Sequence, residues 1–433
     1  MYLHSKLENH KENIKIAFIG CGKFISMFLS QYNQLKKIKI DTIVDLDIER
    51  AKLNCIKSGL TKEIIEKINF VSSLDTILNR NIEIFIEATG NAVAGTQHAY
   101  KVIQSKKNII MVNVEADVLC GKYLSDLAKE NNVIYSMAYG DQPSLILEQI
   151  EWARLNGFLV TCAGKGTKYH PSFEYSTPES VWSNYGITTE AAKNGGMNPK
   201  MFNSFVTGDK SSIEMAAVAN ASGLRCPENG LTYPPVGVYD IANKLIPKNK
   251  GGHIDYEGQV EVISSIDRNK IQIENDLRWG IFIVIKAQNN YVKNCFKEYG
   301  MVTDKSGNYS AIWRPYHYIG LELAQSIYSI ALDQKPTGYT KFFNADVASI
   351  AKKDLSVGEI LDGEGGYASK GKLVTSKKSV ENNFLPLGLS DGAKTKRPIK
   401  KDEYIKIDDV EINWKQEVLQ ARKYQINIIN QKN

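Results

Sequence analysis

The densest group of reactive side chains follows an apolar stretch at residues 158–163. It is the segment Gly164-Lys165-Gly166-Thr167-Lys168-Tyr169-His170. A lysine can polarise or protonate a carbonyl oxygen as hydride reaches the carbon, and it can hold a phosphate as a point charge. We therefore predict that Lys165, Lys168 and His170 form a catalytic group, on a loop that two glycines make compliant. The structural alternative is a surface loop whose lysines are only solvated.

Three further cationic side chains stand in mostly apolar surroundings. Arg278 lies in the segment DLRWG, and Arg314 and His317 lie in RPYH. A guanidinium can bind a phosphate or carboxylate through two parallel hydrogen bonds. We predict that these three residues contact the substrate, although each one alone is more often a structural ion pair or a helix cap.

A second kind of chemistry is indicated near the amino terminus, between residues 14 and 47. A short apolar run ends in Gly20-Cys21-Gly22, and a segment of helical pattern follows, beginning near Lys23 and Phe24. Glycines in such a turn let the backbone approach a pyrophosphate, and the helix N-terminus favours its charge. The third glycine of the usual fingerprint is replaced by Ile25, a position that serves packing between helix and strand. This arrangement predicts dinucleotide binding, against a purely structural sheet.

An acid follows the second apolar run, where a ribose would bind. Asp45 ends that run and is better placed than Asp47. A carboxylate there suits the 2′-hydroxyl of NAD, and it would oppose a 2′-phosphate by about 4 kcal/mol at about 4 Å and an effective dielectric near 20. Arg50 could cancel that penalty, so the sequence leaves NADH and NADPH open.

Two other strand ends carry small or polar residues that we assign to the cofactor. They are Ala88, Thr89 and Gly90 after one apolar run, and Asn113 and Glu115 after the next. Ligands of parallel sheets bind at the carboxyl edge, where small residues would let a nicotinamide ring approach. The plain alternative is a pair of strand-end turns.

The elements around these residues predict an α/β architecture. Strands are expected at 14–19, 38–45, 68–71, 82–88, 107–113 and 132–136, with helices between them. This alternation predicts a doubly wound parallel sheet, that is, an N-terminal Rossmann domain over residues 1–156. We expect Gly121 to open one of its helices and Gln142-Pro143 to open the next.

The rest of the chain divides into three further parts. Residues 157–336 are predicted to form an α+β catalytic domain, with strands at 158–163, 258–265, 270–275 and 280–287 and helices at 211–220 and 317–333. Residues 337–413 carry short apolar pieces about ten residues apart, typical of a small all-β domain. Residues 414–433 have helical composition.

Composition excludes several classes of protein. The net charge of +6 is spread along the chain, and its densest basic run, 394–401, is interrupted by a proline, so nucleic-acid binding is not expected. The six cysteines include no CxxC pair, which argues against a disulfide scaffold or a zinc ribbon. No apolar run approaches the roughly 18 residues of a membrane span. We expect a cytoplasmic protein.

Many segments, in order along nearly the whole chain, resemble homoserine-dehydrogenase-like NAD(P)-dependent oxidoreductases that carry a C-terminal SAF domain. The segments are GCGKF, EATG, MVNVEADV, YGDQPS, AGKGTKYHP, STPESVW, MNPKMFNSF, EMAAVANASGL, DLRWG, EYG, RPYH and GLELA, with AKKDLSVGEILDGEGGY and LPLGL in the SAF part. The group includes enzymes similar to 1-deoxy-D-xylulose 5-phosphate reductoisomerase, which serves isoprenoid precursor synthesis.

The resemblance implies an N-terminal Rossmann domain, a central catalytic and dimerisation domain, a homodimer, and NADPH for the reductoisomerase type. A ketose phosphate would bind Lys165, Lys168 and Arg278, and Mg²⁺ or Mn²⁺ could bind Asp141, Glu115 and Glu174 with water. Two alternatives remain. One is a dehydrogenase or oxidoisomerase of an unphosphorylated branched sugar acid, and the other is a non-catalytic cofactor-sensing or interaction protein.

Overall fold

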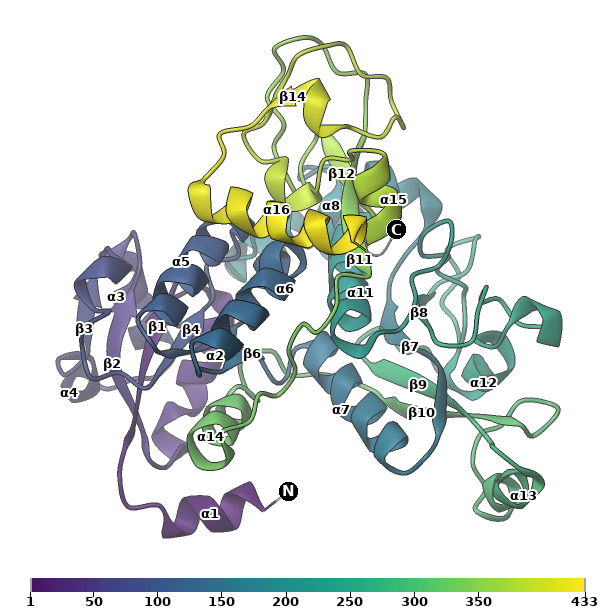
Figure 1. Ribbon diagram of the computed structural model, residues 1–433, viewed down its shortest axis with the longest axis horizontal. Coiled ribbons are helices and arrows are strands. Elements are labelled where there is room, and N and C mark those ends of the chain that lie inside the picture. Colours follow the sequence, from purple (N-terminus) through teal and green to yellow (C-terminus); the bar gives the residue numbers. More distant parts are fainter. Residues whose placement is uncertain (1, 432–433) are drawn as a thin grey trace. The chain divides into compact units, whose positions relative to one another are not determined.

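The computed structural model describes residues 2–431, which form two compact units (Figure 1). Unit 1 contains the chain up to Leu145 together with Tyr318–Lys341 and Lys415–Asn427. Unit 2 contains Ile146–His317, Phe342–Trp414 and the residues from Ile428. The four-part domain division drawn from the sequence stays a prediction.

A six-stranded sheet forms the centre of unit 1, in the order β3-β2-β1-β4-β5-β6, with every neighbouring pair parallel. Its strands are β1 (Ile14–Ile19), β2 (Ile38–Val44), β3 (Asn69–Val71), β4 (Ile84–Glu87), β5 (Asn108–Met111) and β6 (Tyr135–Met137). The runs are rich in isoleucine because both faces of a parallel sheet are buried. The predicted doubly wound sheet is confirmed. Its order reverses between β1 and β4, where such sheets bind ligands.

Helices cover both faces of this sheet (Figure 1). The helices of unit 1 are α1 (Leu3–Asn9), α2 (Lys23–Gln31), α3 (Ile48–Lys57), α4 (Lys62–Ile65), α5 (Ala92–Gln104), α6 (Val114–Glu130), α14 (Ala324–Asp333) and most of α16 (Gln416–Asn430), with short 3₁₀ turns at Tyr32–Gln34 and Leu74–Thr76. Asparagine or aspartate side chains cap three of them: Asp47 caps α3, Asn91 caps α5 and Asn113 caps α6. Helix α6 therefore begins at Val114, and the prediction that Gly121 opens it is wrong.

Helix α14 corrects a second expectation. The segment 317–333 was predicted to be helical and part of the catalytic domain, but the helix begins at Ala324. Its buried residues Ala324, Ile327 and Ile330 pack in one core with isoleucines of β1 and β2. An apolar helical face does not reveal which distant sheet it will cover, so the sequence could not assign this partner.

Unit 2 is built on a four-stranded mixed sheet in the order β10-β9-β7-β8. Its strands are β7 (Leu159–Thr167), β8 (Gln259–Ser264), β9 (Ile281–Lys286) and β10 (Tyr309–Arg314). The strand predicted at 270–275 is wrong. Asp267 accepts hydrogen bonds from the backbone N–H groups of Asn269 and Ile271, so the chain turns there instead of extending.

Helices and a second β region complete unit 2. The helices are α7 (Gln142–Leu155, which begins in unit 1 where Gln142-Pro143 was expected to open it), α8 (Val181–Tyr185), α9 (Thr189–Asn194), α10 (Pro199–Thr207), α11 (Asp209–Ser222), α12 (Ile241–Lys244), α13 (Asn290–Glu298) and α15 (Ser376–Glu381), with 3₁₀ turns at Pro171–Tyr175, Val238–Asp240, Lys248–Lys250, Leu387–Leu389 and Ile407–Asp409. The later region pairs β11 (Ala345–Ala351) with β12 (Ser369–Thr375) and β13 (Lys394–Thr395) with β14 (Val410–Glu411), all antiparallel. Helix α15 and short 3₁₀ turns lie in the same region, and its assignment as a small all-β domain stays a prediction.

Candidate active site

The glycine turn of unit 1 connects β1 to α2 at the carboxyl edge of the sheet. Gly20 has φ = +90°, and a Cβ there would lie 2.9 Å from the carbonyl oxygen of Ala88, so only glycine fits. Gly22 immediately precedes Lys23 and Phe24 at the start of α2. A Cβ at Gly22 would have no atom of the described chain within 4 Å, apart from its chain neighbours. The turn thus leaves space directly above the start of α2, where a pyrophosphate would fit.

Asp45 ties the end of β2 to this turn. One carboxylate oxygen accepts a 2.8 Å hydrogen bond from the Cys21 N–H, and the other accepts one of 2.9 Å from the Asp47 N–H. The guanidinium of Arg50 lies 3.4 Å from Asp45, with most of its side chain exposed. Asp47 instead caps α3 by accepting from the Arg50 N–H. A carboxylate and a cation therefore lie side by side at the end of β2.

The turn after β4 is held from two sides. The Oε1 atom of Glu87 accepts from the Thr89 hydroxyl at 2.5 Å and from His98 Nδ1 at 3.1 Å. From the β5 side, the Asn113 amide donates to the carbonyl of Asn91 at 2.9 Å. These bonds fix the residues 88–90 beside the glycine turn. Glu115 is the second residue of α6.

In unit 2, the predicted catalytic and substrate residues meet at one end of the sheet. Ile281 of β9 pairs with Lys165 of β7 on one side and with Arg314 of β10 on the other. The backbone of Gly166 bonds to Gly280 at 3.0 Å, which brings the Arg278 segment to the same end. His317 follows β10 and its Nδ1 lies 2.7 Å from the carbonyl of Trp279. Three segments distant in sequence thus converge.

The two glycines of this segment do not make a flexible loop, and that expectation is wrong. Residues up to Thr167 belong to strand β7 and are mostly buried. A Cβ at Gly164 would lie 1.7 Å from the Glu261 carbonyl oxygen, and one at Gly166 would lie 1.8 Å from the Leu277 carbonyl oxygen. The glycines are therefore required by close contact between backbones.

Lys165 is buried and forms an ion pair with Glu214 of α11. A buried charge without a partner is costly, so each group serves as the counter-ion of the other. The sequence did not assign Glu214 to the site, because 49 residues separate it from Lys165. The pair places one ammonium group, with its counter-ion, at the sheet end.

Lys168 and Arg278 form a cationic group with Lys270, and we refer to these three residues as the cationic cluster. Lys168 donates to the Asn184 carbonyl at 2.7 Å, and Arg278 donates to the neighbouring Tyr185 carbonyl at 3.3 Å. Partial burial, with Arg278 and Lys270 close by, lowers the pKa of Lys168. Like charges are thus gathered at a point where an anion would stabilise them.

Arg278 is also oriented by aromatic rings. Its guanidinium lies 4.9 Å from the ring centre of Tyr185 and 4.7 Å from that of Trp279. Aromatic rings at such distances attract a guanidinium without using its hydrogen-bond donors. The sequence pattern did not indicate Lys270, Tyr185 or Trp279. The feature that could have indicated an aromatic contact is Trp279, which directly follows Arg278.

His170 lies close to Lys165 and Lys168 in the sequence, but its own contacts are with other residues. Its Nδ1 contacts Ser172 at the start of a 3₁₀ turn, and its Nε2 lies 3.1 Å from the Arg268 carbonyl. Both ring nitrogens therefore have partners in the chain. These contacts hold the ring against the backbone after β7, and the catalytic role of His170 stays a prediction.

Metal centres and membrane-spanning helices find little support among the described residues. Residues 2–431 contain no group of three or more His, Cys, Asp or Glu side chains arranged to hold a metal ion. Glu174, one of the predicted metal ligands, accepts from the Tyr169 hydroxyl and from Lys370 at 2.8 Å. Within the same residues, no helix combines the length and the apolar character that crossing a bilayer demands.

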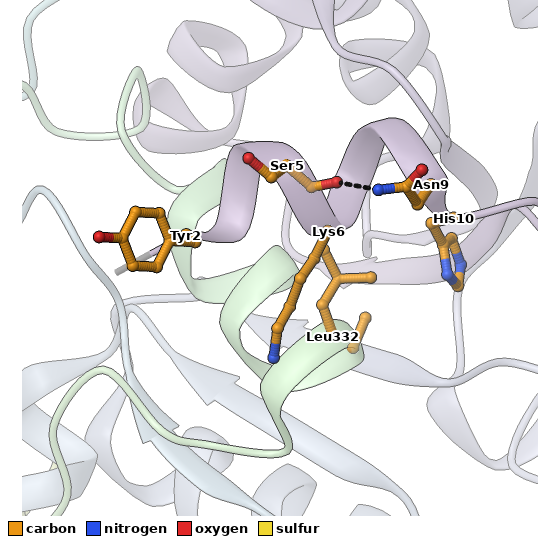
Figure 2. Close-up of a pocket in the computed structure, with 7 residues that line it drawn as sticks. Tyr2, Ser5, Lys6, Asn9, His10 and Leu332 are labelled. Atoms are coloured by element: carbon orange, nitrogen blue, oxygen red, sulfur yellow. Dashed lines mark hydrogen bonds between the residues drawn. The ribbon is translucent and has the colours of Figure 1, made fainter.

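A surface cavity of about 450 Å³ lies between α1 and the end of α14 (Figure 2). Tyr2, Lys6, His10 and Leu332 line it. Ser5 and Asn9 line it as well, and the Asn9 side chain donates a hydrogen bond to the Ser5 carbonyl. None of the residues assigned to the coenzyme or the substrate lines it. The cavity is therefore separate from the predicted chemistry.

Comparison with known proteins gives one family match and one curated relative. Residues 140–323 match the family described as "Oxidoreductase DRL, catalytic domain". The 1-deoxy-D-xylulose 5-phosphate reductoisomerase of Endomicrobium trichonymphae is 27% identical over 123 residues, which are 28% of this chain and 31% of that protein. The chain thus matches about a third of the length of this relative.

Solved structures of oxidoreductases show a distant likeness. An oxidoreductase from Bacillus cereus is 16% identical with a TM-score of 0.38, covering 75% of this chain and 90% of that one. The 1-deoxy-D-xylulose 5-phosphate reductoisomerase from Zymomonas mobilis, solved with NADPH, is 13% identical with a TM-score of 0.34, covering 48% and 58%. The family match, which contains the whole cationic cluster, supports an oxidoreductase.

Proposed function

We propose that the chain is an NAD(P)-dependent oxidoreductase that reduces or oxidises a small phosphorylated sugar derivative, in the manner of 1-deoxy-D-xylulose 5-phosphate reductoisomerase. The observation that supports this most is the cationic cluster at one end of the unit 2 sheet. It lies inside the segment that matches an oxidoreductase catalytic domain. SAF character for residues 337–413, a homodimer and a role in isoprenoid precursor synthesis belong to the same proposal.

A phosphate is the ligand that best suits the cluster. Lys168 supplies a compact charge, and Arg278 supplies a fork of donors with two aromatic rings close to its guanidinium. One cation and one anionic oxygen at about 4 Å attract by roughly 4 kcal/mol at an effective dielectric near 20. A bound phosphate would also oppose the burial and the repulsion from Arg278 and Lys270 that lower the pKa of Lys168.

The residues of unit 1 fit a nicotinamide coenzyme. The space above Gly22 and the start of α2 would receive the pyrophosphate, and the carboxylate of Asp45 would lie near the ribose. When bound, the coenzyme supplies or accepts hydride. Thr89 and Gly90 would line the nicotinamide side, with the turn held by Glu87 and Asn113.

The ammonium of Lys165 is the group best suited to the carbonyl oxygen of a substrate. It is paired with Glu214, and it can donate a hydrogen bond to oxygen as negative charge develops there. Residues 2–431 contain no group of three or more His, Cys, Asp or Glu side chains that could hold a metal ion, and no step is assigned to a metal.

An unphosphorylated branched sugar acid is the second candidate substrate. The observation that favours it is the orientation of Arg278, because a flat guanidinium suits a planar carboxylate as well as a phosphate. The two candidates differ in charge, and only the first requires Lys168 and Arg278 at once.

Oxidation of the reduced coenzyme, followed by its absorbance, tests the proposal. The wild type should oxidise NADPH or NADH when given 1-deoxy-D-xylulose 5-phosphate with a divalent ion present, and should respond weakly to the unphosphorylated sugar. Lys168→Met should reduce turnover by about 100-fold, as loss of a charge-stabilising group does. Lys305→Met, at an exposed lysine of unit 2, is the control. Activity on sugar acids alone would select the second candidate, and silence with both coenzymes would reject the proposal.

A further inference from the structure

Glu87 is a completely buried carboxylate at the point where the order of the parallel sheet reverses. It is the last residue of β4, and its register partners are Ile19, which ends β1, and Met111, which ends β5. Its side chain has no solvent-accessible surface. Nothing in its sequence position alone distinguishes it from an ordinary strand end.

The two oxygens of this carboxylate have unequal surroundings. Oε1 accepts from the Thr89 hydroxyl and, more weakly, from the Thr89 N–H, and it also faces His98 Nδ1 at 3.1 Å. Because a carboxylate only accepts, His98 must donate through Nδ1. Oε2, in contrast, receives no hydrogen bond from any residue between 2 and 431. A glutamine would supply the same acceptor to Thr89 and His98 at a lower desolvation cost, so hydrogen bonding alone does not account for the charge.

The geometry points to a role for this charge: we propose that Glu87 is a positioning residue that places a fixed negative charge under the nicotinamide half of the coenzyme and so favours its oxidised, positively charged ring. The inference rests on the proposed function, because it requires that a nicotinamide coenzyme binds at this edge. Ligands of doubly wound sheets bind beyond the strand ends where the order reverses, which here is between β1 and β4. The burial of Glu87 limits solvent screening of its charge.

His98 and Thr89 hold the charge in place. His98 lies in α5 with about a quarter of its side chain exposed, so it links the buried carboxylate to the surface. Thr89 belongs to the turn at the sheet edge and donates its hydroxyl to the same oxygen. The carboxylate therefore cannot swing away from the edge without breaking both bonds.

Calorimetric titration of the full chain with NAD⁺, NADH, NADP⁺ and NADPH tests the inference. For the tighter-binding coenzyme pair, Glu87→Gln should raise the ratio of oxidised to reduced dissociation constants by roughly three- to tenfold, as removal of one partly screened charge would. Glu83→Gln is the matched control. It makes the same change on the same segment at the opposite end of β4, where Glu83 is exposed and accepts from the Lys15 N–H, and it should leave the ratio unchanged.

Two further variants separate charge from structure. Glu87→Asp should keep a ratio near that of the wild type, since it keeps the charge. His98→Lys, which adds a fixed cation at a partly exposed position, should raise the ratio even if Glu87→Gln fails to fold. Equal weakening of both forms by Glu87→Gln, or an unchanged ratio in His98→Lys, would overturn the inference. If the wild type binds none of the four coenzymes, the proposed function itself fails.

Discussion

The ion pair between Lys165 and Glu214 defines the chemistry that unit 2 can offer. Both side chains are almost completely buried, and each is the other's counter-ion. Removing one partner leaves an isolated buried charge, which is far more costly than losing both. The pair is therefore a structural requirement as well as the source of the proposed proton or hydrogen-bond donor.

We expect Glu214→Ala to lower the free energy of unfolding by about 3–5 kcal/mol. The double variant Lys165→Met with Glu214→Leu should regain most of that loss, because it removes both charges and keeps the volume. Guanidinium unfolding of the three proteins measures the difference. A loss below about 1 kcal/mol in Glu214→Ala would mean that solvent reaches Lys165 and that the pair is not buried in solution.

At the scale of single elements, β7 shows how far the sequence could be interpreted. The apolar start of the strand and the reactive residues after it were evident, and so was their location near the end of a sheet. By sequence alone, Gly164 and Gly166 predict a flexible loop. They are instead places where the backbones of Glu261 and Leu277 approach too closely for any side chain. Such contacts come from tertiary packing, and spacing along the chain does not reveal them.

Alanine at Gly166 should prevent correct folding of unit 2, because the new methyl group would overlap the Leu277 carbonyl. Alanine at Gly22 should leave the fold intact and weaken coenzyme binding, because its methyl group would occupy the space above α2. Circular dichroism and coenzyme titration distinguish the two. A well-folded Gly166→Ala protein would contradict the described packing of β7.

Helix α6 provides a titratable contact within unit 1. Asp117 is buried, and it accepts hydrogen bonds from the Tyr135 hydroxyl at 2.7 Å and from the Thr340 hydroxyl at 2.9 Å. Burial raises the pKa of Asp117 to about 6, although both hydrogen bonds oppose the rise. The folded protein thus binds a proton more tightly here than the unfolded chain does.

The sign of the pH effect follows from linkage. A raised folded pKa gives stability that is fully present below the unfolded value of 3.8 and is lost as the pH rises through about 6. Relative to Asp117→Asn, the wild type should lose up to about 3 kcal/mol of unfolding free energy between about pH 4 and pH 6, and little beyond. Urea unfolding across this range measures it. Parallel pH profiles for the two proteins would show that Asp117 does not titrate in this window.

At the scale of the whole molecule, local patterns predicted unit 1 better than unit 2. The Rossmann-type sheet follows from alternating runs and glycine spacing, which are short-range features. The position of Lys165 at the same sheet end as Arg278 and Arg314 depends on the pairing of β7 with β9, in which Lys165 and Ile281 are more than a hundred residues apart. Helix α14 packs in the core of unit 1 against β1 and β2, which are also far from it in the sequence. The sequence identified the residues that carry chemistry, and long-range pairing determined which of them meet.

The most direct test of the whole account is coenzyme oxidation by three proteins in parallel: the wild type, Gly22→Ala and Lys168→Met. With 1-deoxy-D-xylulose 5-phosphate and a divalent ion, the wild type should oxidise the reduced coenzyme. Gly22→Ala should fail through weak coenzyme binding, and Lys168→Met should bind coenzyme normally and turn over about 100-fold more slowly. A wild type that binds no coenzyme, or a Lys168→Met protein as active as the wild type, would contradict the account.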